Sequence, residues 1–96
     1  MGYYLQVPMP HGKALELAAK HGGELVSKEQ AAEAMNDPTK GVVVVVDNGP
    51  FEAAGFAFDQ GEWEAFNLPG DKRPRKFVVL DRETAERESG FPRGGA

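Results

Sequence analysis

The stretch GVVVVVDNGPFEAAGFAF, residues 41–58, decides the fold of this chain, because five consecutive valines precede a turn and a second apolar run. Valine branches at Cβ, which restricts its side chain and favours a strand over a helix. The pair Asn48-Gly49 is preferred in tight hairpin turns. The stretch therefore predicts a β-hairpin, with residues 42–46 as its first strand and residues 54–58 as its second.

Local patterns predict the elements on either side of this hairpin. Alternating side chains indicate strands, apolar residues at helical spacing indicate helices, and Ser or Asp followed three residues later by Gln or Glu indicates a helix start. The predicted elements, in order, are a strand at residues 3–8, a helix within residues 10–23, a short helix opened by Ser27 and Gln30, a helix capped by Asp59 with Glu62, a strand at residues 76–81 and a terminal helix capped by Asp81.

This order of elements predicts an α+β fold of the ferredoxin-like βαββαβ kind, with helices on one face of the sheet, an extra short helix after the first one and a C-terminal helix. The expected strand order, 4-1-3-2, places the valine strand at an edge. An uncharged apolar edge is a pairing hazard, so we expect a second copy to cover it through Val42, Val44 and Val46, giving a homodimer. The alternative is a central valine strand in another α+β topology, buried on both faces.

Length and composition restrict the class of protein. A chain of 96 residues with 41% hydrophobic side chains is enough for one domain, expected at residues 1–90, with residues 91–96 as a flexible tail. The chain has no cysteine, which excludes disulfides and thiolate metal sites and suits the cytoplasm. We see no apolar run long enough to span a membrane and no metal-binding spacing, and we expect no cofactor.

Charge is unevenly distributed along the chain, whose net charge is -4. No Lys, Arg or His lies between Lys40 and Lys72, and the basic run DKRPRK follows at residues 71–76. We interpret that run as a solvated loop before an apolar strand. In the middle third of the chain, residues 41–71, every charged side chain is acidic. This pattern predicts a surface that binds a basic protein partner. The residues expected to carry this interaction are Asp47, Glu52, Asp59, Glu62 and Glu64.

The segment DNGPFEAAGFAFDQGEWEAF, residues 47–66, resembles the region around the DGPF signature of YciI-like proteins. The resemblance implies a dimeric α+β barrel built from ferredoxin-like subunits. It also implies an acid–base pair formed by a histidine near the first helix and an acid near the turn, here His11 and Asp47. This chain departs from the signature by carrying Asn48 between the acid and Gly49.

Residues 55–58, Gly-Phe-Ala-Phe, resemble the core of the third strand of the RNA-recognition motif. The resemblance implies that bases stack on these phenylalanines and on Tyr3 or Tyr4 over an open sheet. However, Ala54 and Asp59 stand where the motif has a basic and an apolar residue. The strand also lies in the acidic third, which disfavours contact with phosphates.

These observations favour a small acidic protein-binding module over catalysis. Such a module could dock on the basic, nucleic-acid-binding surface of a larger protein. Its small size, acidity and GPF turn are similar to accessory proteins of phages and mobile elements, including inhibitors of host defence complexes. The alternatives are a YciI-like enzyme that uses His11 and Asp47 as acid and base, and an RNA-recognition-motif-like binder of single-stranded RNA.

Overall fold

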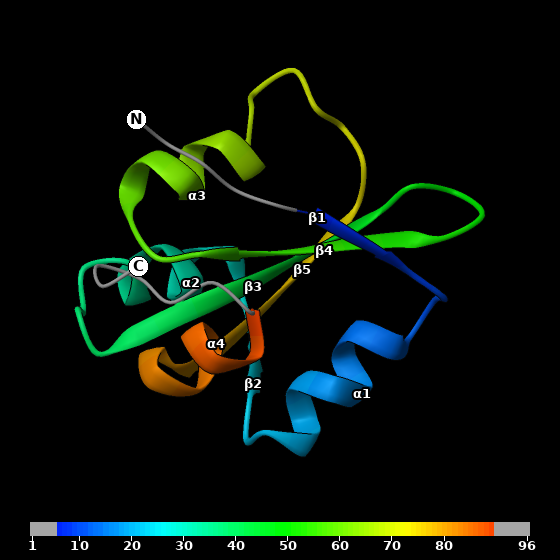
Figure 1. Cartoon of the computed structure of the whole chain (residues 1–96). Coiled ribbons are helices and arrows are strands. Elements are labelled where there is room, and N and C mark those ends of the chain that lie inside the picture. Colours follow the sequence, from blue (N-terminus) through cyan, green and yellow to red (C-terminus); the bar gives the residue numbers. More distant parts are fainter. Residues whose placement is uncertain (1–5, 90–96) are drawn as a thin grey trace.

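A computed structural model of the chain describes residues 6–89 (Figure 1), so Tyr3, Tyr4 and the predicted tail at residues 91–96 lie outside the described residues. The elements, in order, are β1 (Gln6–Met9), α1 (Lys13–Lys20), β2 (Glu24–Val26), α2 (Lys28–Ala34), β3 (Lys40–Asp47), β4 (Glu52–Ala57), α3 (Gln60–Phe66), β5 (Arg75–Asp81) and α4 (Arg82–Ser89). The predicted hairpin and all four predicted helices are confirmed, while β2 is an additional strand. None of these helices is long and apolar enough to cross a membrane.

The sheet has the order β1-β4-β3-β5-β2, and every neighbouring pair is antiparallel. The predicted α+β class is confirmed, but the ferredoxin-like order is wrong. The prediction that the helices lie on one face is also wrong, because α1 and α4 cover one face and α2 and α3 the other. The ferredoxin-like order would pair the strand now seen as β5 with β1, whereas β5 pairs with β3 along seven positions, from Lys40–Asp81 to Val46–Arg75. The valine strand therefore lies at the centre of the sheet, as the alternative interpretation required.

The valine strand is buried on both faces of the sheet. Val42, Val44 and Val46 pack into a cluster under α2 and α3, with Met35, Trp63 and Phe66 among its members. Val43 and Val45 point to the opposite face, where α1 and α4 contribute Ala14, Ala18 and Ala85 to a second cluster. No valine of the run is more than 4% exposed. An unbroken apolar run suits such a strand, because neither of its faces meets water.

This burial corrects the expected role of the valines in self-association. Val42, Val44 and Val46 are 0%, 0% and 1% exposed, so they form no surface that a second copy could cover. Both edges of β3 are already paired, one with β4 and the other with β5. The strand that covers the valine edge belongs to the same chain.

The predicted helix caps are present. At α2, Ser27 Oγ accepts from the Gln30 backbone N–H at 3.1 Å, and Gln30 Oε1 accepts from the Ser27 N–H at 3.0 Å, which completes a capping box. At α3, Asp59 Oδ1 accepts from the Glu62 N–H at 2.8 Å. These bonds satisfy N–H groups that a helix start otherwise leaves unpaired, so the two starts are fixed locally.

The additional strand β2 depends on the close approach of the chain at Gly23. A Cβ on this residue would lie 2.6 Å from a methyl group of Val78 and 2.8 Å from the Ala18 carbonyl oxygen. The glycine pair that ends α1 therefore also lets the chain return against β5, where Leu25 pairs with Val78. Three residues give too short a pattern to identify as a strand from sequence.

We expect Val44→Glu to unfold the domain, because it places a carboxylate where the side chain is 0% exposed. The control is Leu68→Glu, which introduces the same group at a side chain that is 57% exposed. Circular dichroism on heating should show a cooperative transition for the parent and the control and none for Val44→Glu. A Val44→Glu variant that melts at the parental temperature would contradict the central position of β3.

Candidate functional site

Three connections meet at one end of the sheet: the β1–α1 loop, the β3–β4 hairpin and the α3–β5 loop (Figure 1). The Asp47 backbone N–H donates to the Pro74 carbonyl at 2.9 Å, which joins the hairpin to the α3–β5 loop. His11 Nε2 lies 3.4 Å from Asp47 Oδ1, which joins the hairpin to the β1–α1 loop. This end therefore gathers polar side chains from segments far apart in the sequence.

His11 and Asp47, the candidate acid–base pair, are brought together by the fold. Asp47 Oδ1 also accepts from the Gly49 N–H at 2.8 Å, which fixes the carboxylate at the start of the hairpin turn. The Gly49 N–H, followed by His11, holds the pKa of Asp47 below its ordinary value. The side chains of His11 and Asp47 are 49% and 47% exposed. The pair can exchange protons with solvent or a ligand, but it lies on an open surface that does not exclude water.

Glu52 has a structural role that corrects its expected place on a binding surface. Its side chain is only 5% exposed, and its Oε1 accepts from the Gly12 N–H at 2.9 Å. Gly12 occupies the N-cap of α1. The residue at N3, Leu15, has no polar side chain that could accept from the N-cap N–H, so Glu52 of β4 supplies the acceptor instead. The apolar residue Leu15 at N3 was the one sequence signal for this contact, and it does not identify the partner.

Glu62 is also buried, at 1% exposure, which again corrects the expectation of a surface residue. Its Oε1 accepts from the Phe58 N–H at 2.8 Å, next to the Asp59 cap of α3. The carboxylate thus bonds the backbone that leads from β4 into the helix. A buried carboxylate of this kind positions the chain and offers nothing to a partner.

The exposed acids of the prediction fall on two different faces. Asp47 lies beside His11, whereas Asp59 and Glu64 lie on the layer formed by α2 and α3. Segments 28–37 and 59–67 of that layer carry five exposed carboxylates and a single basic residue, Lys28, while Lys40 at the start of β3 lies close enough to Asp37 for their charges to interact. We call these carboxylates the acidic helical face; they are Glu29, Glu33, Asp37, Asp59 and Glu64.

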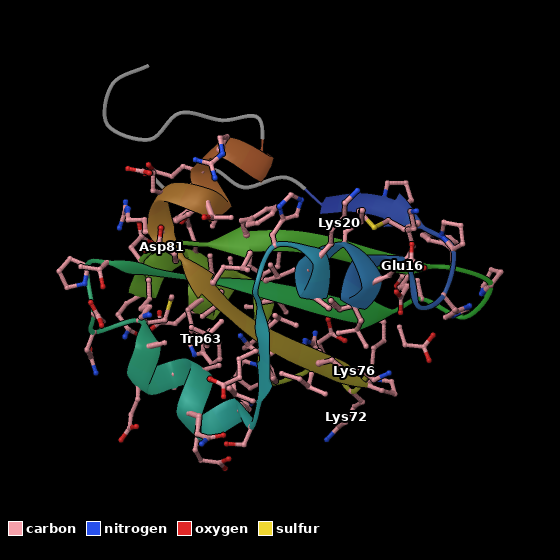
Figure 2. The ribbon with its side chains drawn as sticks, turned by 90° about the horizontal axis from the view of Figure 1, so that it is seen from below. Glu16, Lys20, Trp63, Lys72, Lys76 and Asp81 are labelled. Atoms are coloured by element: carbon pink, nitrogen blue, oxygen red, sulfur yellow. The ribbon has the colours of Figure 1, made fainter. Side chains whose placement is uncertain are left out.

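The opposite layer, formed by α1 and α4, carries charges of both signs that pair with one another. Lys13 lies 3.2 Å from Glu16, Arg82 lies 3.2 Å from Glu86, and Glu83 lies 3.9 Å from Arg87. Figure 2 shows Glu16 and Lys20 on the same helix of this layer. The acidic excess is therefore concentrated on the acidic helical face.

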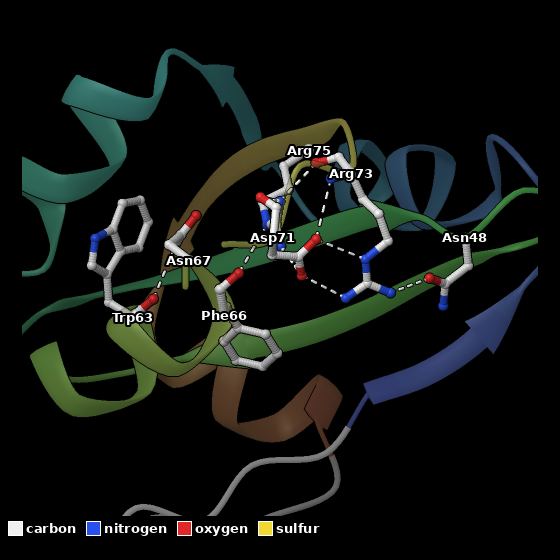
Figure 3. Close-up of polar contacts among 7 residues, drawn as sticks. All are labelled: Asn48, Trp63, Phe66, Asn67, Asp71, Arg73 and Arg75. Atoms are coloured by element: carbon white, nitrogen blue, oxygen red, sulfur yellow. Dashed lines mark hydrogen bonds and ion pairs between the residues drawn. The ribbon is translucent and has the colours of Figure 1, made fainter. Parts of the chain in front are cut away.

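Side chains of the basic run at residues 71–76 hold the α3–β5 loop in place through ion pairs and hydrogen bonds (Figure 3). Asp71 binds the guanidinium groups of Arg73 and Arg75 together, and Arg73 Nη1 also donates to Asn48 Oδ1 in the hairpin. Arg75 is only 10% exposed and donates to the Phe66 carbonyl at the end of α3, at 2.8 Å. Lys72 and Lys76 remain exposed. The run is therefore in part structural, with two lysines left at the surface.

The stacking platform implied by the RNA-recognition motif is not formed by residues 55–58. Phe58 is 6% exposed, and Phe56 is partly buried against the same cluster. The two rings stack on each other, with centroids 6.1 Å apart, under the α1 and α4 layer. Because helices cover both faces of the sheet, these rings are core residues.

At the other end of the sheet, α4 begins beside a shallow polar hollow of about 460 Å³, lined by Thr39, Asp81, Arg82, Glu83 and Glu86. It lies apart from His11 and Asp47. Among residues 6–89, no three His, Cys, Asp or Glu side chains lie close enough together to hold a metal ion.

Comparison of the chain with models of protein families, with curated proteins and with solved structures finds no match.

We expect the network around Asp71 to make stability depend on pH. Arg73, and then Arg75, hold the pKa of Asp71 far below its ordinary value. A lowered pKa in the fold means that the carboxylate stabilises the protein above about pH 4, and that this contribution is lost on further acidification. The melting temperature of Asp71→Asn should therefore lie below that of the parent at pH 7, and the gap should close toward pH 2.

The matched control for this measurement is Glu64→Gln, which neutralises an exposed carboxylate outside the network. It should melt near the parental temperature at pH 7. A gap between Asp71→Asn and the parent that stays constant from pH 7 to pH 2 would contradict the stabilising role of the ionised Asp71.

Proposed function

We propose that the chain is a small protein-binding module that docks on a basic surface of a larger protein through the acidic helical face. The observation that carries this proposal is the segregation of charge between the two helical layers. On the α2 and α3 side, segments 28–37 and 59–67 carry five exposed carboxylates and one lysine, with Lys40 near one of them, while the α1 and α4 side pairs its charges internally. A surface of one sign attracts a partner of the opposite sign and speeds its approach.

A basic surface of the required kind is found in proteins that bind nucleic acids, because they neutralise phosphates with Lys and Arg. A module docked there would occupy the place of the nucleic acid, as an inhibitor or accessory protein does. The residues Asp59 and Glu64 of the sequence prediction take part in this proposal. Glu52 and Glu62 do not, because both are buried.

Charge reversal on the acidic helical face tests the proposal. We expect Glu33→Lys with Glu64→Lys to slow association with an immobilised arginine-rich peptide by about tenfold or more at low ionic strength. The control is Glu16→Lys with Glu83→Lys, which changes the net charge equally on the opposite layer. It should bind faster than the first variant, and added salt should reduce the difference.

Both double variants change exposed side chains, so circular dichroism should show the parental fold. Equal loss of binding in the two variants would mean that only net charge matters, and the proposed face would be wrong. Unchanged binding by a folded Glu33→Lys, Glu64→Lys variant would also exclude it.

A second candidate function is acid–base catalysis by His11 and Asp47, favoured by their 3.4 Å contact. Histidine gains or loses a proton near neutral pH, and a carboxylate beside it can orient the ring. The contact joins the two residues that the YciI-like resemblance implies. It requires a substrate that itself covers the exposed pair.

Hydrolysis of p-nitrophenyl acetate tests whether this pair is reactive. If it is, His11→Ala and Asp47→Asn should both slow the reaction relative to the parent. The control is His21→Ala, which removes the other histidine and should leave the rate near that of the parent. Equal rates for His11→Ala and the parent would exclude a reactive pair.

A further inference from the structure

The sheet ends in two outer strands, β1 and β2, whose outer edges differ. β1 contains Pro8 and is followed by Pro10, and proline lacks the N–H that an added strand would need. β2 contains no proline. In Figure 2, β2 lies in front of β5, and no other described strand or helix lies in front of β2. The outer edge of β2 is therefore the edge at which the sheet can be extended.

The side chains of β2 mark this edge as a contact surface. Leu25 is 61% exposed, although it sits on a strand and not at a loop tip. It pairs with Val78 and so lies on the face of the sheet covered by α1 and α4. Edge strands are usually protected by charge, proline, a bulge or short length. β2 is short and carries Glu24, but Leu25 at its centre presents an apolar side chain.

We propose that β2 pairs with β2 of a second copy of this chain, antiparallel and across a two-fold axis, with Leu25 opposite Leu25. In this register each Glu24 lies opposite Val26, and Gly23 lies opposite Ser27. The two leucines then cover one another on one face. Only small side chains meet at the ends of the paired segment, so the two chains can approach closely.

Charge complementarity supports this register. Glu24 pairs with Val79 and Val26 with Phe77, so both β2 residues point to the face of the sheet covered by α2 and α3. Lys28 begins α2 two residues beyond Val26. Pairing Glu24 with Val26 of the second copy therefore places Glu24 diagonally between Glu24 of that copy and the start of its α2, where Lys28 offsets the like charge. The two-fold axis repeats this pair, so one interface gains two oppositely charged contacts.

The proposed interface is small, because β2 has only three residues. Specific interfaces usually bury about 1,200–2,000 Å² in total, and pairing of two three-residue strands falls below this range, so the dimer should dissociate on dilution. When the two strands pair, the sheets of the two copies form one continuous sheet. The face covered by α2 and α3 then lies on the same side in both copies. The two acidic helical faces would thus be presented together, which increases the strength with which a partner carrying two basic sites is held.

Light scattering during size exclusion tests the proposal on the full chain. At high concentration the parent should approach twice its mass of 10.4 kDa and fall toward 10.4 kDa on dilution. Leu25→Lys, which places two positive charges opposite each other, should stay at the single mass. The control Leu68→Lys, at a side chain 57% exposed outside β2, should behave as the parent does. Glu24→Lys should weaken the dimer, and Glu24→Lys with Lys28→Glu should restore it.

A covalent test uses the absence of cysteine from the chain. A single Leu25→Cys can form a disulfide only with a second copy, and directly opposite positions in a sheet lie close enough for this bond. Under mild oxidation it should cross-link at least about tenfold faster than Leu68→Cys. A parent that is monomeric at every concentration, a dimer unchanged by Leu25→Lys, or equal cross-linking of the two cysteine variants would each overturn the proposal.

Discussion

The structure depends on the burial of both faces and both edges of one strand. β3 pairs with β4 on one side and β5 on the other, and its valines supply both apolar clusters of the core. Each helix of the described chain covers one of the two faces of the sheet, and β3 lies at the centre of both faces. The two layers of helices, and the surfaces they present, follow from this division.

Burial also determines which charges remain available. Two of the carboxylates in the acidic middle third, Glu52 and Glu62, turn inward to bond backbone N–H groups of Gly12 and Phe58. The basic run at residues 71–76 also loses a surface charge in this way, because Arg75 donates a hydrogen bond to the Phe66 carbonyl at the end of α3. What is left outside is a layer with an acidic excess and a layer whose charges are paired. The function argued for this chain rests on that remaining difference.

Local sequence patterns predicted the elements well, because each was fixed by neighbours in the chain. The capping box at Ser27 and the cap at Asp59 need only residues three positions away. The hairpin itself was also predicted from its turn residues, but Asp47 pairs with Glu52, so residues 48–51 connect the strands and not Asn48-Gly49 alone. The position of β5 was mispredicted, because the crossover from β4 through α3 can place the next strand on either side of β4, beyond β3 as observed or beside β1 as predicted. The three-residue strand β2 was missed, because its pattern is too short and depends on contact with β5.

The candidate site was predicted unevenly for the same reason. The proximity of His11 and Asp47 came from a family resemblance, and the fold does bring them within 3.4 Å. Charge along the sequence was taken as charge on the surface, and this failed for Glu52 and Glu62, which are buried and bond backbone N–H groups. The bond from Gly12 to Glu52 joins residues far apart in the chain. Neither residue belongs to a sequence pattern that predicts the other as its hydrogen-bond partner.

The pairing of β3 with β5 has a consequence for how the chain is made. Synthesis proceeds from the amino terminus, so β3 and β4 leave the ribosome before β5 exists. During that interval one edge of a five-valine strand has no partner, and such a strand can pair with other chains. Protection comes when β5 emerges and inserts between β3 and β2. The length of that delay, set by α3 and the loop that follows it, is the period in which the newly made protein is most exposed to aggregation.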